Sequence, residues 1–142
     1  MSLMACFLEY NRKRIYMKRL FTLFAISLVL CSFSFSLGIE DVVVALRSGN
    51  AAQVAKYFDN TVEITLPEKS NSYSKSQAEM ILKDFFANNP IKGFDVIHKG
   101  ENAGSQYCIG TLITKNASFR TTVFMKQKGD KQTLQEIRFE NR

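Results

Sequence analysis

The chain has 142 residues, a formal net charge of +6 and three cysteines. The charge is unevenly spread, because residues 1–36 carry five basic residues and one acidic residue, while the rest carries 14 basic and 12 acidic. A near-neutral second part gives no electrostatic footprint for nucleic acid, so the composition argues against nucleic-acid binding.

The N-terminal segment has the pattern of a secretory signal peptide. A basic lead at 17–19 precedes a strongly apolar stretch, 20–31. That stretch has the length of a signal-peptide core and is short for a membrane-spanning helix. Small residues at Ser34 and Ser36 then predict cleavage before Leu37.

Two other fates of this segment stay open. Left uncleaved, it is a membrane anchor, and Cys31 is a candidate lipidation site, although Leu30 is larger than the residue a lipoprotein peptidase usually accepts. Met17 is a better candidate start than Met1, because basic residues follow it directly. We therefore expect an exported protein, periplasmic or extracellular, that meets a membrane only through residues 1–36 if these are retained.

The remainder, 37–142, predicts one domain. Its one cysteine, Cys108, cannot form an internal disulfide, so the domain depends on its hydrophobic core. A chain of about this size buries about two thirds of its unfolded surface, which suffices for a single core. Cys108 itself stands in an apolar run and is expected to be a small buried residue.

The first half of this domain predicts short helices and one strand. Apolar residues at helical spacing predict a helix over 39–47, and Asn50 can cap a second helix over 51–58. Alternation over 61–65 then predicts a strand. The polar segment 68–75 predicts a loop or a weak hairpin around Tyr73.

A longer amphipathic helix follows. Ser76 and Glu79 have the spacing of a capping box, which marks its start. Phe85 and Phe86 lie on its apolar face, and Pro90 follows its end. We expect this phenylalanine-rich face to pack on a sheet.

The rest predicts an antiparallel meander. Short turns separate strand-like runs, which implies that consecutive strands pair antiparallel. Gly110, central in its strand, is a candidate for a bulge or bend. With its helices segregated from these strands, the domain predicts an α+β fold on one antiparallel sheet. The four runs are 94–99, 105–114, 119–127 and 133–140, with core faces expected at Phe119, Thr121, Val123, Met125, Ile137 and Phe139.

Residues 47–62 contain the end of a short helix, then small residues, Tyr-Phe-Asp and the start of a strand. This order resembles the opening of the nuclear transport factor 2-like superfamily. The resemblance extends over about 39–140. More narrowly, the chain is similar to small exported bacterial proteins of this fold whose function is uncharacterised. Ketosteroid isomerase and scytalone dehydratase share this fold. The resemblance implies a cone, in which a bent sheet wraps the long helix and leaves a cavity whose lining carries the function.

The hypothesis that follows is a non-catalytic binding or interaction module. Its cavity would hold a small apolar or amphipathic ligand, or its sheet would pair with a partner. On the outer sheet face, Arg120, Glu136 and Arg138 predict a charged ladder that could form a homodimer interface. The candidate ligand-binding residues are Tyr57, Phe58, Phe85, Phe94, His98 and Tyr107.

The alternative is a small cofactor-free isomerase or lyase. It would use His98 or Asp95 as base and Tyr107 as hydrogen-bond donor. The first two lie three apart on a predicted strand, so we expect them on opposite faces and no local dyad. With a single histidine and no spaced ligand set, no metal site is predicted and no cofactor is implied.

Overall fold

The computed structural model describes Tyr10, Tyr16, Met17 and residues 38–142. The predicted signal peptide, its cleavage site, the lipidation site and the choice of start fall largely outside the described residues and stay predictions. Within the described part of the chain, no helix has the length and apolar character needed to cross a membrane. Residues 37–142 group as one compact unit.

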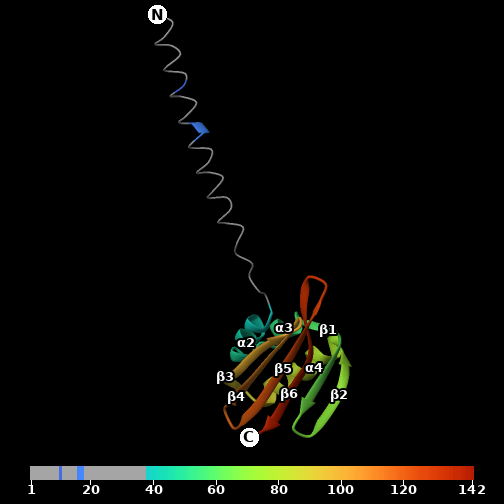
Figure 1. Ribbon diagram of the computed structural model, residues 1–142. Helices are drawn as coiled ribbons and strands as arrows, with labels where there is room; N and C mark the ends of the chain where they lie inside the picture. Colours follow the sequence, from blue (N-terminus) through green and yellow to red (C-terminus); the bar gives the residue numbers. More distant parts are fainter. Residues whose placement is uncertain (1–9, 11–15, 18–37) are drawn as a thin grey trace, which may run out of the picture. The chain divides into compact units, whose positions relative to one another are not determined.

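The unit is one mixed sheet with helices on one of its faces (Figure 1). Strand order is β2-β1-β6-β5-β4-β3, and every neighbouring pair is antiparallel except β1 and β6, which are parallel. The predicted α+β class and the antiparallel meander β3 to β6 are confirmed. The elements are α2 (Ile39–Arg47), α3 (Ala51–Ala55), β1 (Phe58–Leu66), β2 (Lys69–Ser74), α4 (Lys75–Asn88), β3 (Ile91–Asn102), β4 (Ser105–Thr114), β5 (Ser118–Lys128) and β6 (Lys131–Asn141).

The first two helices form for the reasons the sequence gives. Helix α2 buries the stripe that includes Val42 and Leu46, and Asn50 caps α3 by accepting a hydrogen bond from the Gln53 backbone N–H. Helix α3 is shorter than predicted, because the chain enters β1 at Phe58, where the Leu134 backbone of β6 pairs with it. The parallel neighbour therefore ends the helix early.

The capping box of α4 lies two residues earlier than predicted. Ser74 is the N-cap, and its backbone N–H donates to Oε1 of Gln77 at 3.3 Å. The prediction of Ser76 and Glu79 in these roles is wrong, because β2 occupies the polar segment and delivers the chain to the helix at Ser74. That segment is thus a paired edge strand.

The β3–β4 hairpin is longer than predicted. Its turn is Ala103–Gly104, with φ of 47° and 80°, so both turn residues lie in the left-handed region that a type I′ turn needs. Residues 101–102, which lie outside the predicted runs 94–99 and 105–114, pair with Ser105 and Gln106. A tight turn leaves no loop between the strands.

A bulge in β3 changes the faces of its residues. Val96 pairs with Gly110 and His98 with Ile109, so Ile97 is an extra residue on β3. The prediction that Asp95 and His98 point to opposite faces is wrong, because the extra residue shifts the alternation and places both on the outer face. The irregularity expected at Gly110 exists, but on the facing strand.

The core lies between the helices and the inner sheet face. The strand residues expected there on β5 and β6 are all buried, which confirms those two core faces. Cys108 is buried as well, as predicted. At Gly110 the missing side chain leaves room for the Phe94 ring, since a Cβ there would lie 2.5 Å from its Cζ atom.

Gly110→Ala is therefore expected to lower the free energy of unfolding by about 1–3 kcal/mol through overpacking. The new methyl group would also meet the Asp95 carbonyl oxygen at 2.7 Å. Gly93→Ala on the facing strand is the control, because nothing lies within 4 Å of its Cβ position. Urea denaturation of both variants checks this, and equal stabilities would contradict the packing described.

Candidate functional site

The inner face of the sheet is filled by phenylalanine rings. Phe85 of α4 stacks on Phe139 of β6, with ring centroids 4.7 Å apart, and meets the edge of Phe119 at 5.3 Å. Phe86 meets Phe139 edge-on at 6.3 Å. These four rings occupy the space between the long helix and the central strands, where the resemblance implies a cavity.

Three of the predicted ligand-binding residues belong to this core. Phe58, Phe85 and Phe94 are only 4%, 8% and 1% exposed. Phe94 lies over Gly110, and Phe85 lies among the other rings. All three side chains are engaged in packing, so a ligand could reach them only at their edges.

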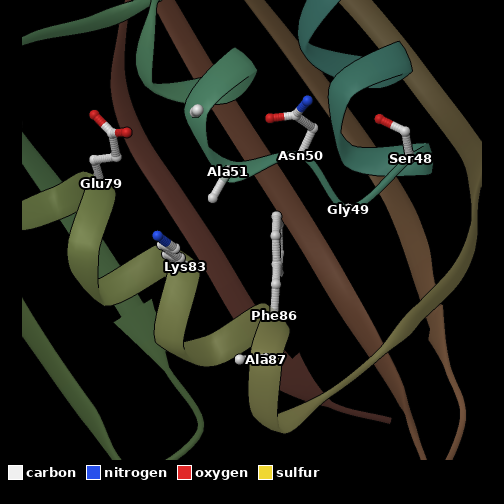
Figure 2. Close-up of a pocket in the computed structure, with 9 residues that line it drawn as sticks. Ser48, Gly49, Asn50, Ala51, Glu79, Lys83, Phe86 and Ala87 are labelled. Carbon is white, nitrogen blue, oxygen red and sulfur yellow. The ribbon is translucent and has the colours of Figure 1, made fainter.

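Two of the surface hollows lie beside the phenylalanine rings of this core. One, of about 480 Å³, lies between the α2–α3 turn and α4, with Phe86 directed toward the turn and Lys83 and Glu79 on the helix side (Figure 2). The other, of about 420 Å³, lies at the β1–β2 turn against Phe85 and Phe119. Both are open to solvent and edged by polar residues.

Tyr57 links the first two helices. Its hydroxyl donates to Oδ2 of Asp41 at 2.9 Å. Burial raises the pKa of Tyr57, and the hydrogen bond to the Asp41 carboxylate raises it further. A hollow of about 370 Å³ lies beside this pair, with Gln53 on its wall. Tyr57 is therefore partly accessible, with its hydroxyl engaged in a contact between helices.

The last two predicted site residues meet on the outer face. His98 Nε2 and the Tyr107 hydroxyl are 3.0 Å apart. The Tyr107 ring covers Gly100, where a Cβ would lie 2.4 Å from the phenol. His98 is exposed and Tyr107 half-buried. The structure brings this pair together, but on the face away from the helices.

Apolar side chains surround that pair. Ile109 and Ile113 of β4 and Phe124 of β5 point the same way as Tyr107 and are half-buried. Ile97, the bulge residue, is 60% exposed. Tyr107, Ile109 and Phe124 are neighbours on β4 and β5, and apolar side chains grouped on an outer face are typical of an interaction site.

A charged row adjoins the apolar residues. Arg138 Nη2 contacts Glu136 Oε1 at 2.6 Å, and Glu140 lies 4.0 Å from the same guanidinium. The hydrogen bond to Glu136 raises the pKa of Arg138, and Glu140 and Glu63 add to the effect. Arg120 stands opposite Glu140 on β5. The predicted ladder of Arg120, Glu136 and Arg138 is confirmed in its position on the outer face.

Sequence reasoning missed one member of this row. Glu63 lies directly beside Glu136, because β1 pairs in parallel with β6. Two carboxylates are thus adjacent across the strands, which is unfavourable; Glu136 is paired with Arg138, and Glu63 accepts a hydrogen bond from the Ser70 hydroxyl at 3.5 Å. Alternation in 61–65 indicates that Glu63 lies on the face opposite Val62 and Ile64, but no local signal predicts which strand lies next to it.

Other chemistry is weakly supported. Burial raises the pKa of Cys108 to about 11, so its thiol stays protonated and is a poor nucleophile at neutral pH. Across the described residues, no three His, Cys, Asp or Glu side chains come together as metal ligands would. The chemistry that stands out is non-covalent contact through the outer face.

Comparison with solved structures shows that the chain has the nuclear transport factor 2-like cone fold. An NTF2-like protein of unknown function from Cytophaga hutchinsonii aligns with a TM-score of 0.52 at 10% identity, over 72% of this chain and 86% of that one. A putative calcium/calmodulin-dependent protein kinase type II association domain from Thiobacillus denitrificans aligns with a TM-score of 0.57 at 8% identity, over 72% and 90%. These likenesses show the fold.

The chain belongs to the family described as Domain of unknown function (DUF4783), which matches residues 39–140. The solved family protein from Bacteroides fragilis is 33% identical, with a TM-score of 0.68 over 72% of this chain and 96% of that one. The one from Bacteroides uniformis is 31% identical, with a TM-score of 0.71 over 73% and 96%. Comparison with curated proteins gave no match.

The raised pKa of Cys108 predicts an unreactive thiol. In residues 37–142, where Cys108 is the one cysteine, a thiol reagent at pH 8 is expected to react at least about tenfold faster after unfolding in urea than before. Because folding raises the pKa of the Cys108 thiol, the stability linked to its protonation is fully present below the pKa of the unfolded thiol. That stability is lost as pH rises toward the folded pKa of about 11. Rapid labelling of the folded domain would contradict this account.

Proposed function

We propose that this protein is an exported, non-catalytic interaction module that pairs with a second copy through its outer sheet face. The outer face is the set of side chains of β3 to β6 directed away from the helices. The observation that carries the proposal is the half-buried apolar cluster at Tyr107, Ile109 and Phe124, next to the alternating charges of β6. Export is supported by the signal-peptide pattern before Leu37.

The packed interior supports the outer face over a ligand cavity. A small apolar ligand inside the cone would have to displace rings such as Phe85 and Phe139, which are in close contact. Protein cores are close-packed, so that displacement would cost the contacts the rings make. A ligand could still use the surface hollows, but these are edged by polar side chains such as Lys83 and Glu68.

A second copy is the partner that the surface chemistry favours. The outer face joins apolar side chains with charges of both signs, so neither a strongly acidic nor a strongly basic partner is selected. Its charges alternate along β6, and an alternating row can pair with another copy of itself. A protein of this fold is named an association domain, which is compatible with association as a use of the fold.

The enzyme alternative has one observation in its favour. His98 and Tyr107, the proposed base and donor, are in hydrogen-bond contact at 3.0 Å. General acid–base catalysis, however, benefits from a site that excludes water, and His98 is exposed on an open sheet face. The same exposure suits a polar contact at an interface, so the pair supports association better.

The domain 37–142 tests the proposal in solution, since the solved relatives consist almost entirely of the matching domain. Light scattering is expected to give twice the monomer mass at high concentration. Arg138→Glu is expected to raise the dissociation constant at least about tenfold, because it sets a glutamate between Glu136 and Glu140 in the charged row of the outer face.

Lys56→Glu is the matched control, because Lys56 is an exposed lysine at the end of α3, on the helical side. It makes the same charge change and is expected to leave the mass unaltered. Circular dichroism should show both variants folded. A wild-type domain that stays monomeric at every concentration would overturn the proposed function.

A further inference from the structure

We infer that the charged row of β6 fixes how two copies pair, with a twofold axis that crosses the strands between Glu136 and Arg138. In this arrangement Arg138 of each copy meets Glu136 of the other. The inference rests on the proposed function and names the residues that make the partner a second copy. It concerns the register of the interface as well as its existence.

The pattern along β6 distinguishes between possible axes. Glu136, Arg138 and Glu140 are two residues apart on one strand, a step of about 6.8 Å. When two identical faces pack on each other, the twofold axis that relates the two copies lies in the interface between them. If this axis runs perpendicular to the strands, β6 packs on β6 of the other copy with its residues in the reverse order. An axis over Arg138 would set each charge against its like, whereas an axis half a step away sets Arg138 against a glutamate.

The neighbouring strands decide which glutamate this is. Strand register aligns Tyr107, Phe124 and Glu136 in one row, and Ile109, Thr122 and Arg138 in the next. An axis between these rows sets Tyr107 on Ile109 of the other copy, so apolar side chains meet. The other half step would set Ile109 on Thr111, whose hydroxyl is already bonded to Arg142 at 3.0 Å.

An axis along the strands fits the face less well. Centred on β5, it would exchange β4 with β6 and place Ile109 against Arg138 of the other copy. That contact would bury apolar surface on charge and strip water from the guanidinium without pairing it. An axis across the strands instead keeps β4 on β4 and β6 on β6, so Tyr107 meets Ile109 and Arg138 meets Glu136.

The same pairing surrounds each charge of the contact with opposite charge. Arg138 contacts Glu136 within one copy at 2.6 Å. Arg138 of the second copy would bring another positive charge to Glu136. Two Glu136 carboxylates and two Arg138 guanidinium groups would then alternate in one cluster, which is favourable at a partly desolvated interface.

A charge swap tests the register. Arg138→Glu alone is expected to weaken the dimer at least about tenfold, because Glu136 would then face a glutamate. The double variant Glu136→Arg, Arg138→Glu is expected to dimerise about as well as wild type, because the row stays self-complementary. Mixed with wild type, the double variant would face like charges at both contacts, so mixed dimers should be depleted.

The readout is native mass spectrometry after subunit exchange with ¹⁵N-labelled wild type, since the swap leaves the mass unchanged. The control is the double variant Glu79→Lys, Lys83→Glu, which exchanges two charges one helical turn apart on α4, away from the outer face. Its subunits are expected to mix with wild type in the statistical 1:2:1 ratio.

The two proposals fail in distinguishable ways. Statistical mixing of the β6 swap with wild type would overturn the register while leaving the dimer in place. The same result would mean that the contact between Glu136 and Arg138 stabilises the single copy and does not set the register of the dimer. Monomers in every sample would overturn the proposed function and the register together. Depleted mixed dimers with an exchanging α4 control would support both.

Discussion

The contact between Phe85 of α4 and Phe139 of β6 is the interaction on which the arrangement of this domain depends. Its ring centroids are 4.7 Å apart, and Phe119 and Phe86 meet the same pair. Because these rings close the space between helix and sheet, the inner face is used for folding. Side chains alternate along a strand, so filling one face leaves the other as the surface on which contact with partners can develop. The fold and the proposed function thus have a common cause.

Much of the fold follows from local signals in the sequence. Helical spacing over 39–47 and the apolar alternation of β5 and β6 predict elements and core faces that the structure has, and the family resemblance on 47–62 predicts the cone. The local errors have physical reasons. Ser74 rather than Ser76 caps α4 because β2 ends there. Asp95 and His98 share a face because an extra residue, Ile97, shifts the alternation of β3.

The candidate site was less accessible to sequence reasoning. The pairing of His98 with Tyr107 needs both the bulge and the β3–β4 register, and neither has a local signature. The neighbourhood of Glu63 and Glu136 needs the parallel pairing of β1 with β6, which joins segments far apart in the chain. A charged ladder on the outer face could be predicted by period alone, but its excess of carboxylates around Arg138 could not. Long-range pairing therefore supplied the features that bear on function.

The central claim is that contact takes place on the outer face while the interior stays packed, and isoleucine methyl NMR on dilution of residues 37–142 tests it most directly. The account predicts that outer-face methyl signals shift with concentration while buried ones do not. Concentration-independent spectra, or shifts confined to buried methyls, would contradict it. The informative residues are Ile97, Ile109 and Ile113 on the outer face, against the buried Ile39, Ile64 and Ile137.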